Sequence, residues 1–237
     1  MSDESEATGE TSETDVTEET SERGRTKNEV NETNETNEMN ETNDTSSADG
    51  LAERRGMNIE VYQPAEDSGL LAQAAVEYPV SGTVLEVGTG SGWVAQQVSE
   101  NTDARVLGSD INPHAARQAR ERGVEAARAN LTAPFRDGVL DAVLFNPPYL
   151  PTDPDNEWDD WMEHALSGGE SGRELIDPFL DDVGRVLTPD GVVLLLVSSL
   201  TGYEAVVERA ESNGFGVETV VQESYPFETL TVIALTK

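Results

Sequence analysis

The apolar positions of residues 58–237 fall into two alternating patterns. Short runs with apolar residues, most of them rich in Val and Leu, at 83–87, 105–109, 124–129, 139–145 and 191–198 predict strands. Apolar side chains that recur every three or four residues predict helices at 69–78, 93–99, 113–121, 174–187 and 203–212. Strands that alternate with helices in this way are typical of an α/β protein, with helices on both faces of a parallel sheet.

The carboxyl-terminal part of the chain breaks this alternation. Residues 217–222 and 229–235 are apolar runs with no helix between them, so they predict an antiparallel hairpin that completes the sheet. A polar stretch after the strand at 139–145 predicts a long loop that reaches about Gly172. The pattern as a whole predicts a Rossmann-like sheet with seven strands.

The first 56 residues lack any such pattern. They are rich in Glu, Thr, Ser, Asn and Asp, and residues 31–45 are close to a tandem Asn-Glu-Thr repeat. Such a segment buries too little apolar surface to offset the entropy lost on ordering. We therefore expect a disordered acidic tail at 1–56 and one folded domain at 57–237.

Charge and composition indicate the solvent conditions and the cellular compartment in which we expect the protein to act. The net charge is −32, from 47 acidic and 15 basic residues, and it is spread over the tail and the domain. This spread favours adaptation to high salt over one acidic surface that docks a basic partner. With no cysteine and two histidines, a metal site is not expected. No apolar run approaches the roughly 20 residues of a membrane span, and the polar start is unlike a signal peptide, so we expect a soluble cytoplasmic protein.

Candidate chemistry is concentrated where the strand at 139–145 ends. That strand runs into Asn146, Pro147, Pro148 and Tyr149. Two prolines fix φ twice and carry no N–H, so the segment holds an amide, free carbonyls and an aromatic face in a stiff arrangement. Asn146 Oδ1 and a backbone carbonyl could accept the two N–H bonds of a planar amino group while Tyr149 stacks on it. The alternative is a proline-rich turn that only ends a strand.

A glycine-rich loop follows the first strand. Its glycines, at 88–92, let the backbone pass close to a ligand at the start of a helix. Glu86 precedes them, and a carboxylate at the end of an apolar strand needs a partner. Asp110 ends the next strand, where it suits the two hydroxyls of a ribose or caps the helix that begins at Pro113. A dinucleotide oxidoreductase is the runner-up for this loop, although an acidic residue before the glycines would repel a pyrophosphate.

Five segments together resemble one family. They are 61–71, which includes Tyr62 and Asp67, and 84–92, 110–113, 145–151 and 168–173. The family is that of the class I methyltransferases that modify the glutamine of the Gly-Gly-Gln motif in class 1 translation release factors, in its eukaryotic and archaeal branch. The resemblance covers about residues 58–237. It implies the class I methyltransferase fold, S-adenosyl-L-methionine as cofactor, and methyl transfer to the side-chain amide nitrogen of that glutamine.

The resemblance also implies a set of site residues. Asn130 stands where the family usually has Asp, and its amide oxygen can still accept a bond from the adenine amino group. His164 is a minor candidate for a general base, and no metal is expected. A substrate loop is expected to be shaped by Gly168, Gly169 and Arg173, and the alternative for Arg173 is an ion pair with Glu170 or Glu174. The implied catalytic residues are Asn146, Pro147, Pro148 and Tyr149. The implied cofactor-binding residues are Ser68, Glu86, Gly88, Gly90, Gly92, Asp110, Asn130, Leu131 and Asn146.

Partners are implied in the same way. A class 1 release factor would be the substrate, and a small zinc-binding activator subunit would form a heterodimer at an edge strand, about 124–129. Asn-Pro-Pro-Tyr also occurs in enzymes that methylate adenine amines, so an enzyme acting on DNA or RNA is the alternative function. The acidic insert at 150–172 argues against direct nucleic-acid binding. A non-catalytic S-adenosylmethionine-binding scaffold is disfavoured because the acceptor motif is intact.

Overall fold

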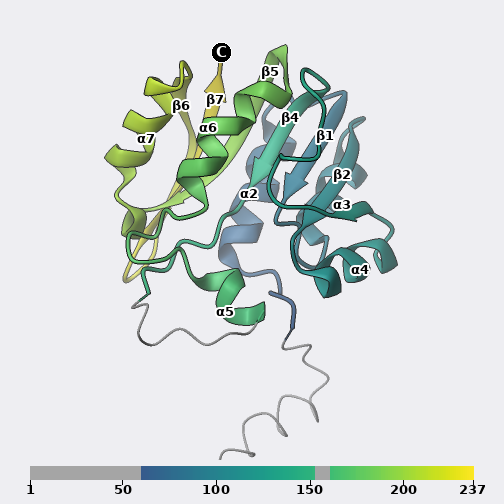
Figure 1. The fold of residues 1–237 in the computed structure, drawn as a ribbon, viewed down its shortest axis with the longest axis horizontal. Coiled ribbons are helices and arrows are strands. Elements are labelled where there is room, and N and C mark those ends of the chain that lie inside the picture. Colours follow the sequence, from purple (N-terminus) through teal and green to yellow (C-terminus); the bar gives the residue numbers. More distant parts are fainter. Residues whose placement is uncertain (1–59, 153–160) are drawn as a thin grey trace, which may run out of the picture. The chain divides into compact units, whose positions relative to one another are not determined.

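The computed structural model describes residues 60–152 and 161–237. The predicted disordered tail lies outside these ranges, so it stays a prediction. The described residues form one seven-stranded sheet in the order β3-β2-β1-β4-β5-β7-β6 (Figure 1). Its strands are β1 (Thr83–Val87), β2 (Arg105–Asp110), β3 (Glu125–Arg128), β4 (Leu140–Phe145), β5 (Leu187–Ser198), β6 (Gly216–Ser224) and β7 (Thr229–Thr236).

Two kinds of pairing meet in this sheet. Strands β3, β2, β1, β4 and β5 are parallel, and β7 lies antiparallel between β5 and β6. The predicted seven-stranded sheet with a carboxyl-terminal antiparallel hairpin is therefore confirmed. From β1 the chain moves outward through β2 to the edge strand β3, and then returns to place β4 on the other side of β1. The loops after β1 and β4 leave the sheet in opposite directions, which opens a crevice at the carboxyl ends of these strands.

Helices cover both faces of the sheet (Figure 1). One face packs against α2 (Glu66–Glu77), α3 (Trp93–Asn101) and α4 (Pro113–Glu121). The other face packs against α6 (Ile176–Val186) and α7 (Tyr203–Ser212). The sheet is thus the middle layer of three, as its alternating strands and helices predict.

From Ala142 to Phe145 the side chains of β4 alternate between these two cores. Ala142 and Leu144 belong to the core beneath α2 and α3, whereas Val143 and Phe145 belong to the core beneath α6 and α7. All four side chains are at most 1% exposed. A slip of one residue would move every one of them to the wrong face, so packing on both sides fixes the register of β4. The position of Asn146, directly after the strand, is fixed with it.

Three elements differ from the sequence prediction. The loop expected to reach Gly172 contains a short helix, α5 (Trp161–Leu166). Its six residues of mixed polarity show no periodic apolar pattern from which a helix could be predicted. Helix α2 begins at Glu66, because the acidic pair at 66–67 forms its first turn. Strand β5 begins at Leu187, which pairs with Leu140 before the register shifts. No helix within the described ranges is long and apolar enough to cross a membrane.

A substitution at Gly92 tests how tightly α3 packs against α4. Gly92 has a φ of 78°, and a Cβ there would lie 2.8 Å from the Cα and the Cβ of Ala119. We expect Gly92→Ala to lower the free energy of unfolding by about 2–4 kcal/mol, because strain at positive φ adds to a clash with backbone. Denaturant titration measures this loss.

Gly214 provides the matched control for that measurement. It has a φ of 87°, and a Cβ there would have nothing within 4 Å. Gly214→Ala should therefore show only the backbone strain, about 1–2 kcal/mol. Equal losses in the two variants would contradict close packing at Gly92.

Candidate active site

A pocket opens at the carboxyl ends of β1, β2 and β4, with α5 beside it. Most of the residues implied by the resemblance meet there, although they come from segments far apart in the sequence. Gly92 and the three residues of the expected substrate loop are not among the lining residues. The implied residues that line the pocket are Ser68, Glu86, Gly88, Gly90, Asp110, Asn130, Leu131, Asn146, Pro147, Pro148 and Tyr149.

Glu86 is buried beneath the glycine loop and is 4% exposed. Its Oε2 accepts from Thr89 Oγ1 at 2.5 Å and from the N–H of Ala95 at 3.0 Å. Burial raises the pKa of this carboxyl to about 8, against the lowering effect of the two hydrogen bonds. At neutral pH the group is therefore mostly protonated, and it joins the glycine loop to the first turn of α3.

Asp110 closes the other side of the glycine loop. Its Oδ2 accepts from the N–H of Gly90 at 2.9 Å, and its Oδ1 accepts from the N–H of Asn112 at 2.8 Å. Burial raises the pKa of Asp110, and the backbone N–H donors oppose that shift. The cap of α4 is Asn112, whose side chain accepts from the N–H of His114 at 2.9 Å. The alternative in which Asp110 caps this helix is therefore wrong.

The acceptor motif at 146–149 holds the clearest sign of a ligand. Asn146 Oδ1 is buried, and within the described part of the chain it has no hydrogen-bond partner. A buried acceptor without a donor costs about 1–3 kcal/mol, so such groups call for a specific explanation. The glycine loop comes close here, since a Cβ on Gly88 would lie 4.0 Å from the carbonyl oxygen of Asn146. The two loops that form the crevice therefore approach each other at Asn146.

The mouth of the pocket contains a second carboxylate and two tyrosines. Asp67 is 5% exposed, accepts from Tyr62 Oη at 3.1 Å, and accepts from the N–H of Ser68 at 2.6 Å. Burial, then the nearby charges of Asp67 and Glu228, raise the pKa of Tyr149. Tyr62 and Asp67 line the pocket but were not among the implied site residues. Their place in the 61–71 motif was the signal that could have identified them.

Helix α5 adds further lining that the sequence did not predict. Trp161 and His164 both line the pocket, with their ring centroids 5.9 Å apart. Because α5 was expected to be loop, neither side chain could be placed from the sequence. The role of His164 as a base stays a minor prediction.

The expected substrate loop lies behind Tyr149 and does not line the pocket. A Cβ on Gly172 would lie 2.8 Å from the carbonyl oxygen of Tyr149, so the two segments are in close contact. The guanidinium of Arg173 donates to the carbonyls of Thr201 and Ser171. Among the described residues these carbonyls are its partners, so the alternative of an ion pair with a neighbouring glutamate is wrong. Arg173 ties this loop to the turn that follows β5.

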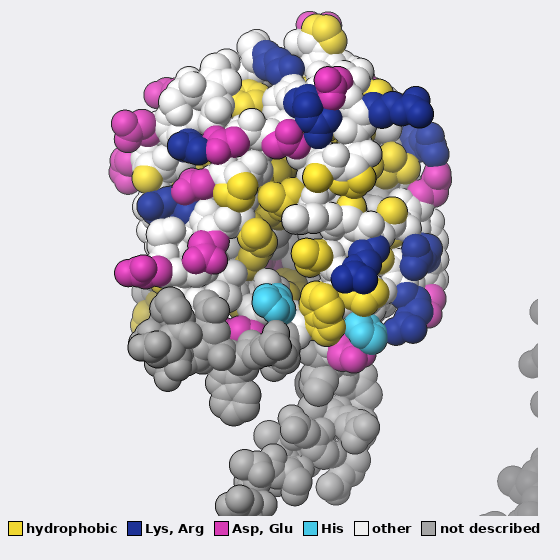
Figure 2. Space-filling model, viewed as in Figure 1, with side chains coloured by type: hydrophobic (Ala, Val, Ile, Leu, Met, Phe, Trp, Pro, Cys, Tyr) yellow, Lys and Arg dark blue, Asp and Glu magenta, His cyan; other side chains and the backbone are white. Residues whose placement is uncertain are grey.

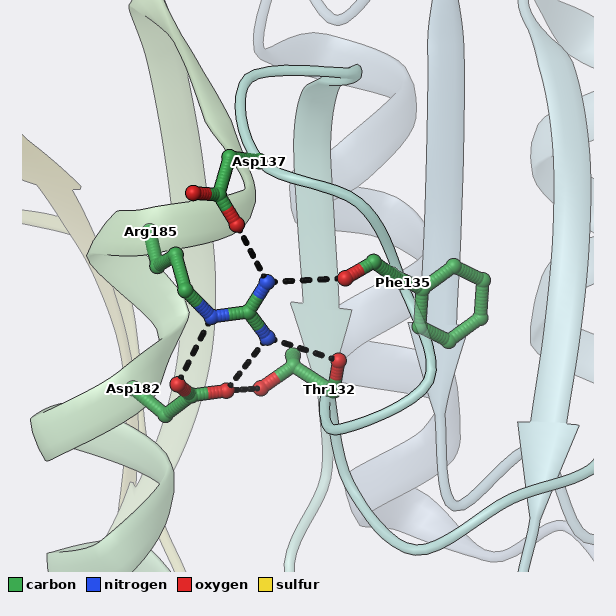
Figure 3. Close-up of polar contacts among 5 residues, drawn as sticks. All are labelled: Thr132, Phe135, Asp137, Asp182 and Arg185. Atoms are coloured by element: carbon green, nitrogen blue, oxygen red, sulfur yellow. Dashed lines mark hydrogen bonds and ion pairs between the residues drawn. The ribbon is translucent and has the colours of Figure 1, made fainter.

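Arg185 of α6 fixes the loop that carries Asn130 and Leu131 (Figure 3). Its guanidinium donates to both carboxylate oxygens of Asp182 at 3.0 Å and to Asp137 at 2.7 Å. It also donates to the carbonyls of Phe135, at 2.8 Å, and Thr132, at 3.2 Å. The hydroxyl of Thr132 donates to Asp182 at 2.7 Å, which closes the cluster.

This cluster holds a strained residue against the pocket. Leu131 has a φ of 46° and is the one residue other than glycine with positive φ in the described ranges. A leucine persists in this conformation only where its surroundings enforce it. The adjoining Thr132 is fully buried and bonded to Arg185 and Asp182. We infer that Arg185 positions Leu131.

Loss of Arg185 should therefore weaken cofactor binding. If Arg185→Ala leaves the loop in its binding conformation about one tenth of the time, the Kd for S-adenosylmethionine rises about tenfold. Arg209→Ala is the matched control, because Arg209 pairs with Asp181 between α6 and α7 and does not touch this loop. Calorimetric titration measures both constants, and an equal Kd in the two variants would contradict a positioning role for Arg185.

Charge around the site is unevenly distributed. Among the described residues that line the pocket there is no Lys or Arg, so a phosphate group would find no cation there. Six of the ten basic residues in the described ranges lie between Arg105 and Arg136. Figure 2 shows dark blue side chains gathered over the side of the molecule that carries β2 and α4 in Figure 1. A chain that is acidic overall thus has a basic side next to its edge strand β3.

The chain is similar to methyltransferases of known type. Residues 84–168 match the family model described as "Methyltransferase domain". A Methanocaldococcus jannaschii protein named as a protein N5-glutamine methyltransferase is 38% identical over 182 residues, covering 73% of this chain and 90% of that protein. Human methyltransferase HEMK2 is 32% identical over 202 residues, covering 77% and 92%.

A solved structure agrees with these sequence matches. The E. cuniculi Mtq2–Trm112 complex, described as responsible for methylation of the eRF1 translation termination factor, contains a chain with a TM-score of 0.64 and 30% identity. The match covers 75% of this chain and 99% of that chain. The likeness therefore extends over the whole methyltransferase fold.

Proposed function

The chain belongs to the protein N5-glutamine methyltransferase family, and from that premise we propose that it methylates the side-chain amide nitrogen of the glutamine in the Gly-Gly-Gln motif of a class 1 release factor. The reaction is S-adenosylmethionine-dependent methyl transfer. Similar proteins carry names for this activity or this target. The unpaired, buried Asn146 Oδ1 is the observation in this chain that carries the proposal.

The pocket fits S-adenosylmethionine better than a dinucleotide. Asp110, Ile111 and Leu131 all line the pocket. We assign Asp110 to the ribose diol and the two apolar side chains to the faces of the adenine. Asn130 offers an amide oxygen to the adenine amino group. The lining described above lacks cations, which suits a cofactor that has no phosphate. When bound, this cofactor supplies an electrophilic methyl group.

The residues after β4 orient the acceptor. An amide nitrogen is a weak nucleophile because its lone pair is delocalised, so position and electrostatics dominate the rate. Asn146 Oδ1 and the Pro147 carbonyl accept the two N–H bonds of the target amide. These bonds become stronger as positive charge develops on nitrogen, and they stabilise the transition state more than the ground state. Tyr149 stacks on the amide plane, and the surplus proton leaves to solvent.

A small activator subunit is part of the same proposal. The edge strand β3 borders an apolar groove lined by side chains that include Leu107, Val124, Ala126 and Phe135. An unpaired edge strand beside apolar surface suits pairing with a strand of a partner. The basic side next to it favours an acidic partner, and we propose a zinc-binding subunit of this kind. Because release factors act in translation, the proposed place of action is the cytoplasm.

The proposed function is tested with labelled S-adenosylmethionine at high salt. The enzyme, with and without the activator, is offered the intact release factor, a variant with the motif glutamine replaced by alanine, and nucleic acid. Label should enter the intact factor and not the alanine variant. Label in nucleic acid instead would favour an adenine-amine methyltransferase and contradict the proposal.

A further inference from the structure

Exposed large apolar side chains in the described ranges gather near the carboxyl edge of the sheet. Four of the six follow parallel strands or lie in the hairpin turn at this edge. Single exposed apolar residues are ordinary, whereas exposed apolar residues joined into one surface mark a place where something binds, and two of these four line the pocket. The four are Ile111, Leu150, Leu200 and Phe227, and the two elsewhere are Val76 and Val139.

Phe227 is the most exposed of these side chains, at 94%. It lies in the turn between β6 and β7, which points toward the same edge as α5 (Figure 1). The turn is held firmly: the N–H of Tyr225 donates to the carbonyl of Glu228 at 2.8 Å, and Ser198 Oγ donates to the Glu228 carboxylate at 2.7 Å. The backbone that carries Phe227 is thus held in place, and an aromatic side chain has few rotatable bonds to restrict on binding, which makes it a good anchor.

Leu200 connects this turn with the acceptor motif. It lies in the short helix Ser199–Thr201 after β5, where Ser199 Oγ accepts from the N–H of Thr229 at the start of β7 at 3.0 Å. On the other side, Thr201 accepts from Arg173 and packs against Gly172, which in turn contacts the Tyr149 carbonyl. Leu200 is thus joined through its neighbours Ser199 and Thr201 to the hairpin and to the pocket mouth.

Leu150 completes the path at the rim of the pocket. It directly follows Tyr149, lines the pocket, and is 38% exposed. Its N–H donates to the carbonyl of Leu166 at 3.0 Å, and its carbonyl accepts from the N–H of Gly168 at 2.9 Å. A rigid backbone therefore presents apolar side chains from the rim outward to the hairpin turn.

We propose that Leu150, Leu200 and Phe227 form a docking surface for the folded protein substrate, contacting the surface around its target glutamine. The inference rests on the proposed function, because the molecule that places an amide at Asn146 must cross this edge. The docking surface explains how a protein is selected when the pocket itself contacts one side chain.

The neighbouring charges favour protein over nucleic acid as the occupant. Glu223 lies near the end of β6 and Glu228 in the hairpin turn, and Tyr225 Oη donates to Glu223 at 2.8 Å. Helix α2, whose first turn contains Glu66 and Asp67, contacts both β6 and β7. The hydrogen bond to Glu223 raises the pKa of Tyr225, and the charges of Glu66 and Asp67 add to that rise. Phosphates would be repelled by these carboxylates. Apolar anchors with an acidic surround instead suit an apolar protein surface that has basic residues around it.

The test compares an intact release factor with a short peptide that contains Gly-Gly-Gln. For each enzyme variant, in complex with its activator, kcat/KM is measured on both substrates, and the ratio of protein to peptide is taken. Phe227→Ala should lower this ratio about tenfold, through a higher KM for the intact factor, because the peptide does not reach the hairpin. Leu200→Ser should lower it as well. Val139→Ala is the control, since Val139 is 43% exposed and precedes β4 at the opposite edge of the sheet.

The outcomes separate the docking surface from the proposed function. If the unsubstituted enzyme methylates the intact factor and the ratio in Phe227→Ala and Leu200→Ser stays within twofold of the control, the docking surface is wrong and the function stands. If the unsubstituted enzyme methylates neither protein nor peptide, the proposed function is wrong, and the docking surface, which rests on it, is wrong as well. A lower ratio in both variants but not in Val139→Ala supports the docking surface.

Discussion

Replacing Asn146 by alanine should lower kcat/KM for the release factor by about 10²–10³-fold, the usual cost of losing one preorganised group that stabilises transition-state charge. The side-chain oxygen is buried and has no hydrogen-bond partner among the described residues, and under the proposed function the substrate amide is that partner. Without it, one N–H of the amide is left unpaired in a buried site and the nitrogen is no longer aligned. Steady-state kinetics with intact factor measures the loss.

The same variant should fold normally, which separates chemistry from stability. Asn146 Oδ1 makes no hydrogen bond within the described residues, so its removal breaks none. We expect the thermal midpoint of Asn146→Ala to lie within a few degrees of the unsubstituted protein, since about 1 kcal/mol corresponds to roughly 2–4 °C at this size. A variant that keeps more than a tenth of the activity would refute the acceptor role of Asn146.

Folding stability should fall as pH rises from about 5 to about 8, because of Glu86. Its carboxyl has an ordinary pKa of 4.5 when the chain is unfolded and a pKa of about 8 when buried. Between these values the folded state keeps a proton that the unfolded state releases, so the free energy of unfolding decreases with pH. The slope contributed by this one group approaches about 1.4 kcal/mol per pH unit, and it vanishes below and above the window.

Glu86→Gln isolates that contribution. The amide oxygen of glutamine can accept the bonds from Thr89 and Ala95, so it imitates the protonated carboxyl but cannot titrate. Denaturant titrations at pH 5, 6, 7 and 8 give both slopes, and groups that do not interact with Glu86 cancel in the difference, whereas the charge of nearby Asp110 contributes to the Glu86 shift. The free energy of unfolding of Glu86→Gln should depend less steeply on pH than that of the unsubstituted protein. Identical slopes would show that Glu86 is already ionised in the folded protein at pH 5.

The sequence predicts the sheet and the acceptor well because both depend on local pattern. The apolar run of β4 ends at Phe145, and the two prolines that follow permit little besides an extended exit from the strand. The position of Asn146 at the sheet edge follows from these two facts. Glycines that end β1 likewise mark the crevice, since parallel strands bring their carboxyl ends to one edge.

The parts that the sequence did not predict depend on contacts between distant residues. Arg185 donates to Asp137 and Thr132, which lie 48 and 53 positions earlier in the chain, and no local sequence pattern predicts these contacts. Strain at Leu131 is a consequence of them and is equally invisible. Helix α5 has six residues, too few for a periodic signal. Arg173 donates to the carbonyl of Thr201, 28 positions later in the chain, and no local pattern predicts that contact.

The double-sided burial of β4 limits how descendants of this gene can vary in length. From Ala142 to Phe145 its side chains alternate between two cores, and Asn146 inherits its direction from the same alternation. An insertion or deletion of one residue between Ala142 and Phe145 would move the side chains that follow it to the opposite face and turn the amide of Asn146 away from the crevice in a single event. Length changes before Leu140 or after Leu150 would leave this alternation of side chains between the two faces unchanged. The number of residues in the strand therefore fixes the direction in which the Asn146 side chain points, and the chemistry at the end of the strand depends on that number.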